Sequence, residues 1–119
     1  MRLLLLIEAA VFLLAALAHL GWTVTGYEHM RAATAESVIG AVLLLGFILA
    51  VAIPGRLRAI GITVQIFALI GTLIGVVMVI IGVGPQTGPD MIYHALMLIL
   101  LGAGIWAYAA KRNRIANTA

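Results

Sequence analysis

The chain contains four long runs of apolar residues, and these runs restrict the fold more than any other feature of the sequence. They cover about residues 3–24, 34–53, 57–83 and 89–110. A helix needs about 20 apolar residues to cross the roughly 30 Å hydrocarbon layer of a membrane, and each run is long enough. Backbone groups find no water there, so a segment that crosses lipid forms a helix. The sequence therefore predicts an all-α bundle of four transmembrane helices.

Composition places the whole chain in a membrane. Of its 119 residues, 65% are hydrophobic and 9% are charged, whereas soluble domains carry about 25% charged residues. A soluble fold of this size could not cover so much apolar surface with so few charges, so the lipid bilayer is the expected partner. We therefore expect a single integral membrane domain over residues 1–119 and no second domain.

The basic residues gather on one side of the predicted bundle. Four spans place both chain ends and the loop at 54–58 on the same side, which holds Arg2, Arg56, Arg58, Lys111, Arg112 and Arg114. The seventh basic residue, Arg31, falls on the other side. By the positive-inside rule, both termini are cytoplasmic and the other loops face outward, across the inner membrane of a bacterium. Basic residues at the ends of apolar runs form no phosphate-binding patch, so nucleic acid is not an expected partner.

Small residues recur along the third span. Gly61, Ala68, Gly75 and Gly82 are spaced by seven residues, and Gly71 lies four residues before Gly75. Small residues at such spacing let two helix backbones approach closely. They could form the seam of a homo-oligomer or pack inside one bundle. We favour packing inside the bundle, because the other three spans must dock somewhere.

Polar residues cluster at the predicted outward end. His19, Glu36 and His94 lie about one turn inside spans 1, 2 and 4, and therefore at a similar depth. Asp90 precedes His94 by four residues, so the two share a helix face. The candidate ligand-binding residues are His19, Glu28, His29, Glu36, Asp90, Tyr93 and His94. We expect them to form or border an outward-facing pocket.

Four interpretations of this outward cluster stay open. His19, His94 and Glu36 offer nitrogen and oxygen ligands suited to Zn or Cu. His19 and His94, on two helices at one depth, could hold a non-covalent haem b between them. Glu36 and the histidines could titrate in a small proton-coupled transporter. In the fourth interpretation, the imidazole and carboxyl groups form hydrogen bonds with one another and only stabilise the helix bundle.

A second polar pair is expected nearer the cytoplasmic side. Glu8 and Gln65 fall at comparable depths of spans 1 and 3. A hydrogen bond between the carboxyl and the amide would offset the free-energy cost of burying both polar groups inside the membrane. Intramembrane acids usually mark functional sites, and Glu8 shares a face of span 1 with His19. A proton path along that face is therefore the functional alternative to a structural clasp.

Enzyme motifs are missing from the sequence. It contains no cysteine, no HExxH zinc motif, no phosphate-binding Walker loop and no GxSxG nucleophile elbow. Its three histidines are too few for the histidine-rich pattern of di-iron membrane oxygenases. We therefore do not predict catalysis by this chain alone.

The four-span pattern with an acid in the first span resembles small multidrug-resistance exporters, in size and in Glu8 only. The strong charge bias argues against the dual topology of some of these exporters. The whole chain more generally resembles small four-helix bacterial inner-membrane proteins of the DoxX-like kind. The stretches "AESVIGAVLLLG" (35–46) and "IYHAL" (92–96) carry this resemblance. It implies a four-helix membrane bundle and assigns no chemistry to any residue.

Taken together, these features predict a non-enzymatic membrane protein that binds a metal ion, haem or a small cationic ligand in an outward-facing His/Glu pocket. One alternative is an accessory or scaffold subunit of a larger membrane complex, whose polar cluster is purely structural. The other alternative is a small proton-coupled transporter.

Overall fold

The computed structural model describes the backbone of residues 1–116 and the side chains of residues 1–110. The described chain forms four long helices and no strand, which confirms the all-α prediction. The helices are α1 (Arg2–His19), α2 (Met30–Ala52), α3 (Leu57–Ile80) and α4 (Gly88–Ala116), with one 3-10 turn, η1 (Pro54–Arg56). All four helices are long and apolar enough to cross a membrane. The protein is therefore a multi-pass membrane protein, and the side chains of Lys111, Arg112 and Arg114 lie outside its described part.

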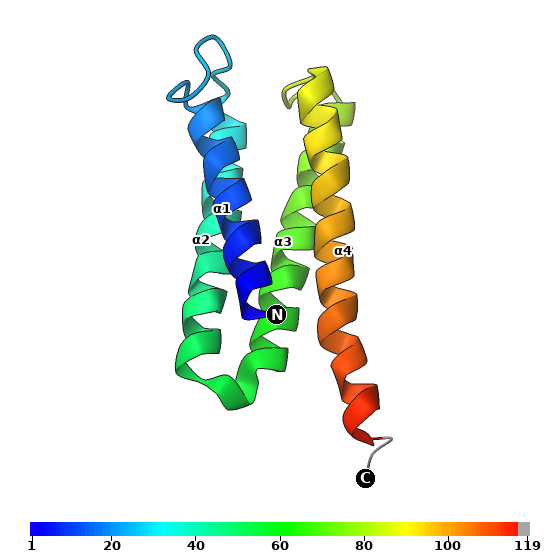
Figure 1. Ribbon diagram of the computed structural model, residues 1–119. Helices are drawn as coiled ribbons and strands as arrows, with labels where there is room; N and C mark the ends of the chain where they lie inside the picture. Colours follow the sequence, from blue (N-terminus) through cyan, green and yellow to red (C-terminus); the bar gives the residue numbers. More distant parts are fainter. Residues whose placement is uncertain (117–119) are drawn as a thin grey trace.

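The helices pack as two hairpins, α1 against α2 and α3 against α4, joined through contact between α2 and α3 (Figure 1). The loops at 20–29 and 81–87 lie together at one end, which we call the histidine end. The short connection through η1 lies at the opposite end, which we call the arginine end. The core between the hairpins includes Leu5, Phe12, Leu43, Leu101 and Tyr108. Many other large apolar side chains are exposed, as expected for a surface that lipid covers.

Two of the predicted spans extend too far at the histidine end, and in both cases a glycine ends the helix. After α1, Gly21 adopts φ +76°, and the Trp22 amide donates to the Leu17 carbonyl. After α3, Gly82 adopts φ +79°, and the Val83 amide donates to the Met78 carbonyl. This is the Schellman arrangement, in which a left-handed glycine closes the last turn. The apolar runs to 24 and 83 therefore include loop residues, because hydropathy does not register helix termination.

The other two spans start earlier than predicted. α2 begins at Met30 and not at 34, because the His29 side chain caps the helix by accepting from the Ala32 amide (3.2 Å). It ends at Ala52, near the end predicted from Pro54. α4 begins at Gly88 and continues to Ala116, beyond the apolar run that ends near 110.

The small residues of α3 lie against neighbouring helices of the same bundle. A methyl group on Gly61 would overlap the Tyr108 ring of α4. One on Gly71 would lie 2.8 Å from the Ile39 side chain of α2. Ala68 is fully buried. These contacts support packing inside the bundle. Gly82 is the exception, since it lies beyond α3 and serves the turn and not helix packing.

Candidate functional site

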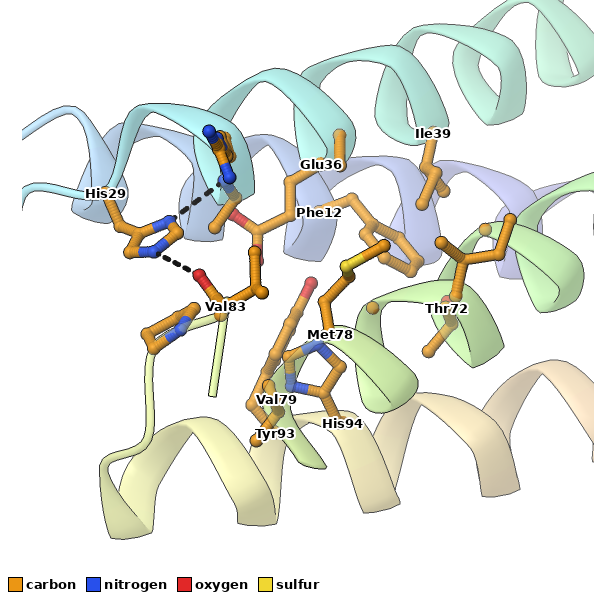
Figure 2. A pocket seen from close by; sticks show the side chains of 18 residues that line it. Phe12, His29, Glu36, Ile39, Thr72, Met78, Val79, Val83, Tyr93 and His94 are labelled. Carbon is orange, nitrogen blue, oxygen red and sulfur yellow. Dashed lines mark hydrogen bonds between the residues drawn. The ribbon is translucent and has the colours of Figure 1, made fainter. Parts of the chain in front are cut away.

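A cavity of about 270 Å³ lies at the histidine end, between α2, α3 and the first turns of α4 (Figure 2). Its walls are largely apolar and include Phe12, Ile39 and Met78. Several lining residues, among them Ala35, Ile74 and Met78, are exposed on the outer surface of the bundle. The cavity therefore opens between α2 and α3, toward the surface that lipid covers.

The Tyr93 hydroxyl is a buried polar group in the wall of this cavity. It has no hydrogen-bond partner among the described residues, although the oxygen is shielded from solvent. Its ring is held edge-on by Phe12 and His94, at centroid distances of 6.1 and 5.4 Å. Figure 2 shows the ring directed into the cavity. A buried hydroxyl without a partner costs free energy, so its position is informative.

His94 presents a second polar atom to the cavity. Its Nδ1 lies 2.7 Å from the Asp90 carbonyl oxygen, one turn back along α4. A carbonyl can only accept, so Nδ1 carries the hydrogen. The remaining nitrogen of the neutral ring, Nε2, is then an acceptor. A methyl group on Gly75 would lie 3.0 Å from Nε2, so the glycine leaves room for the ring.

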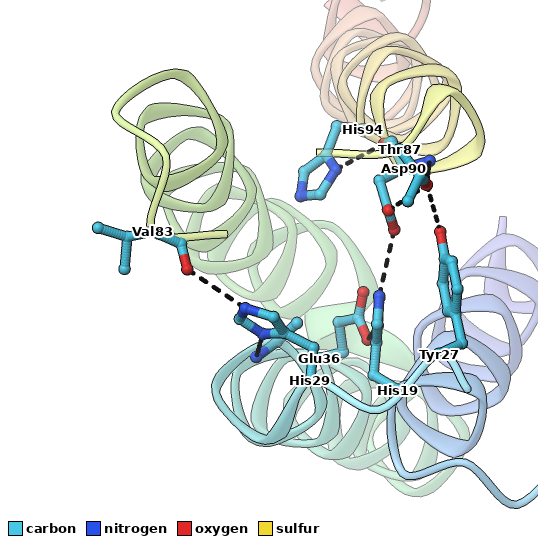
Figure 3. Close-up of polar contacts among 9 residues, drawn as sticks. His19, Tyr27, His29, Glu36, Val83, Thr87, Asp90 and His94 are labelled. Atoms are coloured by element: carbon cyan, nitrogen blue, oxygen red, sulfur yellow. Dashed lines mark hydrogen bonds and ion pairs between the residues drawn. The ribbon is translucent and has the colours of Figure 1, made fainter. Parts of the chain in front are cut away.

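Glu36 connects the cavity to a buried polar cluster of His19, Glu36 and Asp90 (Figure 3). His19 lies between the two acids, with Nδ1 2.7 Å from Glu36 Oε2 and Nε2 3.1 Å from Asp90 Oδ1. All three are nearly inaccessible, with exposures of 3% for His19, 5% for Glu36 and 2% for Asp90. The cluster joins α1, α2 and α4 at one level.

The two contacts of His19 fix how many protons the cluster holds. Each contact between a ring nitrogen and a carboxyl oxygen needs one hydrogen. The three groups therefore share two hydrogens, either as an imidazolium with two carboxylates or as a neutral imidazole with one carboxyl protonated. Both distributions give the cluster a net charge of −1.

The second oxygen of Asp90 continues the network toward the surface. The Thr87 hydroxyl donates to Asp90 Oδ2 at 2.5 Å and lies 2.6 Å from the Tyr27 hydroxyl. Because the only hydrogen of Thr87 is used on Asp90, Tyr27 donates to Thr87. Burial and the nearby Asp90 carboxylate raise the pKa of Tyr27, so the phenol keeps the proton that it donates. The Tyr27 ring also stacks on His19 at 5.2 Å.

His29 and Glu28 serve the loops and stand outside this cluster. His29 caps α2 through Nδ1, and its Nε2 donates to the Val83 carbonyl at 3.2 Å, which ties the two outer loops together. The exposed Glu28 carboxylate accepts from the Gly26 amide in its own loop (3.1 Å). His29 lines the cavity, whereas Glu28 does not.

The structure does not assemble the predicted metal or haem site. His19 meets Glu36, but its third partner is Asp90, and His94 points into the cavity. Both nitrogens of His19 face carboxyl oxygens, so neither is free to ligate Zn, Cu or haem iron. Among the described residues, no three His, Asp or Glu side chains are grouped so that they could hold a metal ion.

The predicted pair of Glu8 and Gln65 is present in the half of the bundle nearer the arginine end. Gln65 Nε2 donates to both carboxyl oxygens of Glu8, at 3.0 and 2.8 Å. Both side chains are fully buried, and Gln65 Oε1 has no partner within the described residues. Phe12, which lies between Glu8 and His19 along α1, is a buried apolar core residue. The pair therefore connects α1 to α3, and no described hydrogen bond links it to the His19–Glu36–Asp90 cluster.

Thr87 and the cavity itself were missed by sequence reasoning. Thr87 does carry a signal, because Thr87-Gly-Pro-Asp90 has the spacing of a capping box at the start of a helix. In the structure, its hydroxyl accepts from the Asp90 amide at 3.3 Å. The cavity has no such signal, since its walls come from apolar residues that look like any other part of a span.

Comparison of the chain with models of known protein families, with curated proteins and with solved structures gave no match. The resemblance to DoxX-like proteins stays a prediction.

Proposed function

We propose that this protein binds a small, lipid-soluble ligand in the cavity at the histidine end. The ligand has a largely apolar body and one hydrogen-bonding group. The observation that carries the proposal is the buried Tyr93 hydroxyl, which faces the cavity and has no partner among the described residues. Pockets that bind small molecules typically combine apolar walls with a few converging polar groups. Here those groups are Tyr93, His94 and Glu36.

The cavity supports binding better than the buried cluster does. His19, Glu36 and Asp90 satisfy one another, so their arrangement is explained by stability alone. The Tyr93 hydroxyl has no such explanation, because leaving a buried polar atom unpaired destabilises a fold. A ligand that pairs with it would remove that cost.

The cavity opens at the apolar surface between α2 and α3, and this position favours a ligand that enters from the membrane. Ala35, Ile74 and Met78 line the cavity and are also exposed on the outer surface between α2 and α3. A lipid-soluble molecule is already concentrated at such a surface. A cavity of about 150 Å³ accepts benzene, so about 270 Å³ suits a molecule of one or two rings.

Blocking the entrance tests this function. We expect 2-naphthylmethanol to raise the thermal unfolding midpoint of the purified protein, because a ligand that binds only the folded state stabilises it. Ala35→Phe places a ring at the entrance and should abolish the increase. Ala41→Phe is the matched control, because Ala41 is exposed on the same helix and does not line the cavity. Ala41→Phe should leave the increase intact.

Two results would contradict binding in this cavity. One is an equal increase in both variants, which would mean that the probe acts on the detergent or the outer surface. The other is no increase in the wild-type protein, with a titration of the same probe showing no saturable binding. That second result would favour the alternative of an accessory or scaffold subunit with a structural polar cluster.

We also infer that the histidine end faces away from the cytoplasm, because Arg2, Arg56 and Arg58 lie toward the other end. The chain has no cysteine, so single cysteines can report orientation. In intact bacterial cells, a membrane-impermeant maleimide should label Val24→Cys and leave Gly55→Cys unlabelled until the membrane is opened. Both positions are exposed, Val24 in the loop at 20–29 and Gly55 in η1 at the opposite end. Labelling of Gly55→Cys alone in intact cells would reverse the topology, and labelling of both would indicate mixed insertion.

A further inference from the structure

The polar atoms of the cavity share one property, which is the ability to accept a hydrogen bond. His94 Nε2 is an acceptor because Nδ1 carries the hydrogen of the neutral ring. Glu36 contributes a carboxyl group, and the Tyr93 oxygen can accept as well as donate. A ligand group that meets all three at once must therefore be rich in donors. A protonated amine is the simplest such group.

The charge of the cavity wall favours the same ligand. The cluster that contains Glu36 carries a net charge of −1 and is almost fully shielded from water. Charges interact more strongly where the surroundings are poorly polarisable, so a cation beside Glu36 is stabilised more than it would be at the surface. Among the described side chains that line the cavity, Arg31 is the one basic residue other than histidine, and it is exposed. Solvent therefore weakens its repulsion of a cation.

Building on the binding function proposed above, we propose that the ligand carries a protonated amine and that it exchanges for one proton of the His19–Glu36–Asp90 cluster. Before binding, the cluster shares two hydrogens and has a charge of −1. When the ammonium donates to Glu36, the hydrogen between His19 Nε2 and Asp90 leaves as a proton. His19 keeps the hydrogen on Nδ1 that it donates to Glu36. Cluster and ligand together then carry −1 again, and no covalent bond between heavy atoms changes.

A hydrogen-bond network connects His19 to the surface. It runs from His19 through Asp90 and Thr87 to Tyr27, with donor–acceptor distances of 3.1, 2.5 and 2.6 Å. Before binding, Tyr27 and Thr87 both donate toward Asp90, so release of the proton requires both hydroxyls to turn their hydrogens toward the surface. Tyr27 lies in the loop at 20–29 and is partly exposed. Glu36 borders the cavity and Tyr27 borders the outer loop, so ligand and proton contact the cluster at different residues. A cation can enter from the membrane while the proton leaves to the aqueous phase.

Several titratable groups surround Glu36 and share in this exchange. They are His19 from α1, Asp90, Tyr93 and His94 from α4, His29 and Arg31 from the start of α2, and Tyr27 from the loop. The residues of α3 that line the cavity carry no ionisable side chain. Among the described contacts, His19 alone bonds directly to Glu36, so a ligand at Glu36 acts through His19 on the proton that His19 shares with Asp90.

An isosteric pair of probes tests the exchange. We would titrate the purified full chain with 2-naphthylmethylamine, which is protonated near neutral pH, and with the uncharged 2-naphthylmethanol. Calorimetry in two buffers of different ionisation enthalpy counts the protons released. The amine should release about one proton per molecule bound and bind about tenfold more tightly for each unit of rising pH while that release lasts. The alcohol should release none, and its affinity should not change with pH.

A conservative variant adds a second readout. Glu36→Gln keeps the shape of the side chain but removes its charge, and should weaken amine binding about tenfold or more, as expected for a lost hydrogen bond to a charged group. Binding of the alcohol should change little. Glu28→Gln is the matched control, because this carboxylate is exposed at the same end and does not line the cavity. It should leave both affinities unchanged.

The outcomes separate this inference from the binding function. If both probes bind equally and neither releases protons, the exchange is wrong and the binding function stands. If the amine binds without proton release, the cation part holds and the coupling fails. If neither probe binds the wild-type protein, the binding function fails first. These measurements on the wild-type protein test both the proton exchange and the binding function, even if Glu36→Gln does not fold.

Discussion

Replacing His19 with alanine should lower the free energy of unfolding by about 3–5 kcal/mol, the range typical of breaking a buried ion pair. Glu36 and Asp90 would keep their buried positions but lose the group that bridges them. Two carboxyl groups would then face each other across an empty space in the membrane. Unfolding in detergent, followed by circular dichroism, measures the loss. His29→Ala is the control and should cost about 1 kcal/mol, because it removes a helix cap at a partly exposed site.

A double variant distinguishes two causes of the stability loss in His19→Ala: carboxyl groups left without a partner, and the space left by the missing ring. If the loss in His19→Ala comes from the partnerless carboxyl groups, then adding Glu36→Gln should recover part of it. If the loss comes only from the missing ring, the second substitution should give no recovery. A loss in His19→Ala no larger than in His29→Ala would show that the cluster does not hold the bundle together.

Gly104→Val should have the second largest effect, at the opposite half of the protein. A methyl group on Gly104 would overlap the amide of Gln65, which is bonded to Glu8. The variant adds the strain of overpacking, about 1–3 kcal/mol, to the loss of buried hydrogen bonds, also about 1–3 kcal/mol. The same unfolding measurement in detergent reports the sum.

Gly102→Val is a matched control on the same helix. Nothing lies within 4 Å of a methyl group built on Gly102, so valine there meets open space. The two variants make the same change in helix propensity, and their difference isolates the contact with Gln65. We expect Gly102→Val to stay within about 0.5 kcal/mol of the wild-type protein. Equal effects at the two positions would mean that α4 does not press on Gln65.

The fold was largely predictable, because one physical requirement determines it. A chain with 65% hydrophobic residues in four runs has no soluble arrangement, and backbone groups in lipid must form helices. The helix ends were less predictable. Gly21 and Gly82 end α1 and α3 through their backbone conformation, inside runs that stay apolar beyond them. Hydropathy measures transfer to lipid and is insensitive to a left-handed turn.

The outward cluster was predictable in membership but not in pairing. Residue counting along each helix places His19, Glu36 and His94 at one level, with Asp90 about one turn from His94. It does not give the rotation of each helix, which depends on how the apolar side chains pack. In the structure, α4 is rotated so that Asp90 meets His19 and His94 turns toward α3. The metal and haem interpretations assumed that His19 and His94 share a ligand, and the structure directs these two rings to different partners.

The cavity was not predictable, because it arises where the packed side chains of neighbouring helices leave a space between them. Small residues such as Gly75 and Ala35 line it, and the same residue types serve close helix packing elsewhere in α3. Sequence patterns do not distinguish a glycine that admits a neighbouring helix from one that leaves a void. The unpaired Tyr93 hydroxyl is equally invisible in the sequence, since tyrosine in a membrane helix usually finds a partner.

The central claim is that a ligand occupies the cavity beside Tyr93 and His94, and a crystal structure with a brominated probe tests it most directly. Crystals grown with 6-bromo-2-naphthylmethanol would locate the bromine by its anomalous signal. We predict one peak inside the cavity, with the probe's hydroxyl within hydrogen-bond distance of Tyr93 or of His94 Nε2. Bromine peaks only on the lipid-facing surface, with core side chains filling the space between α2 and α3, would contradict the account.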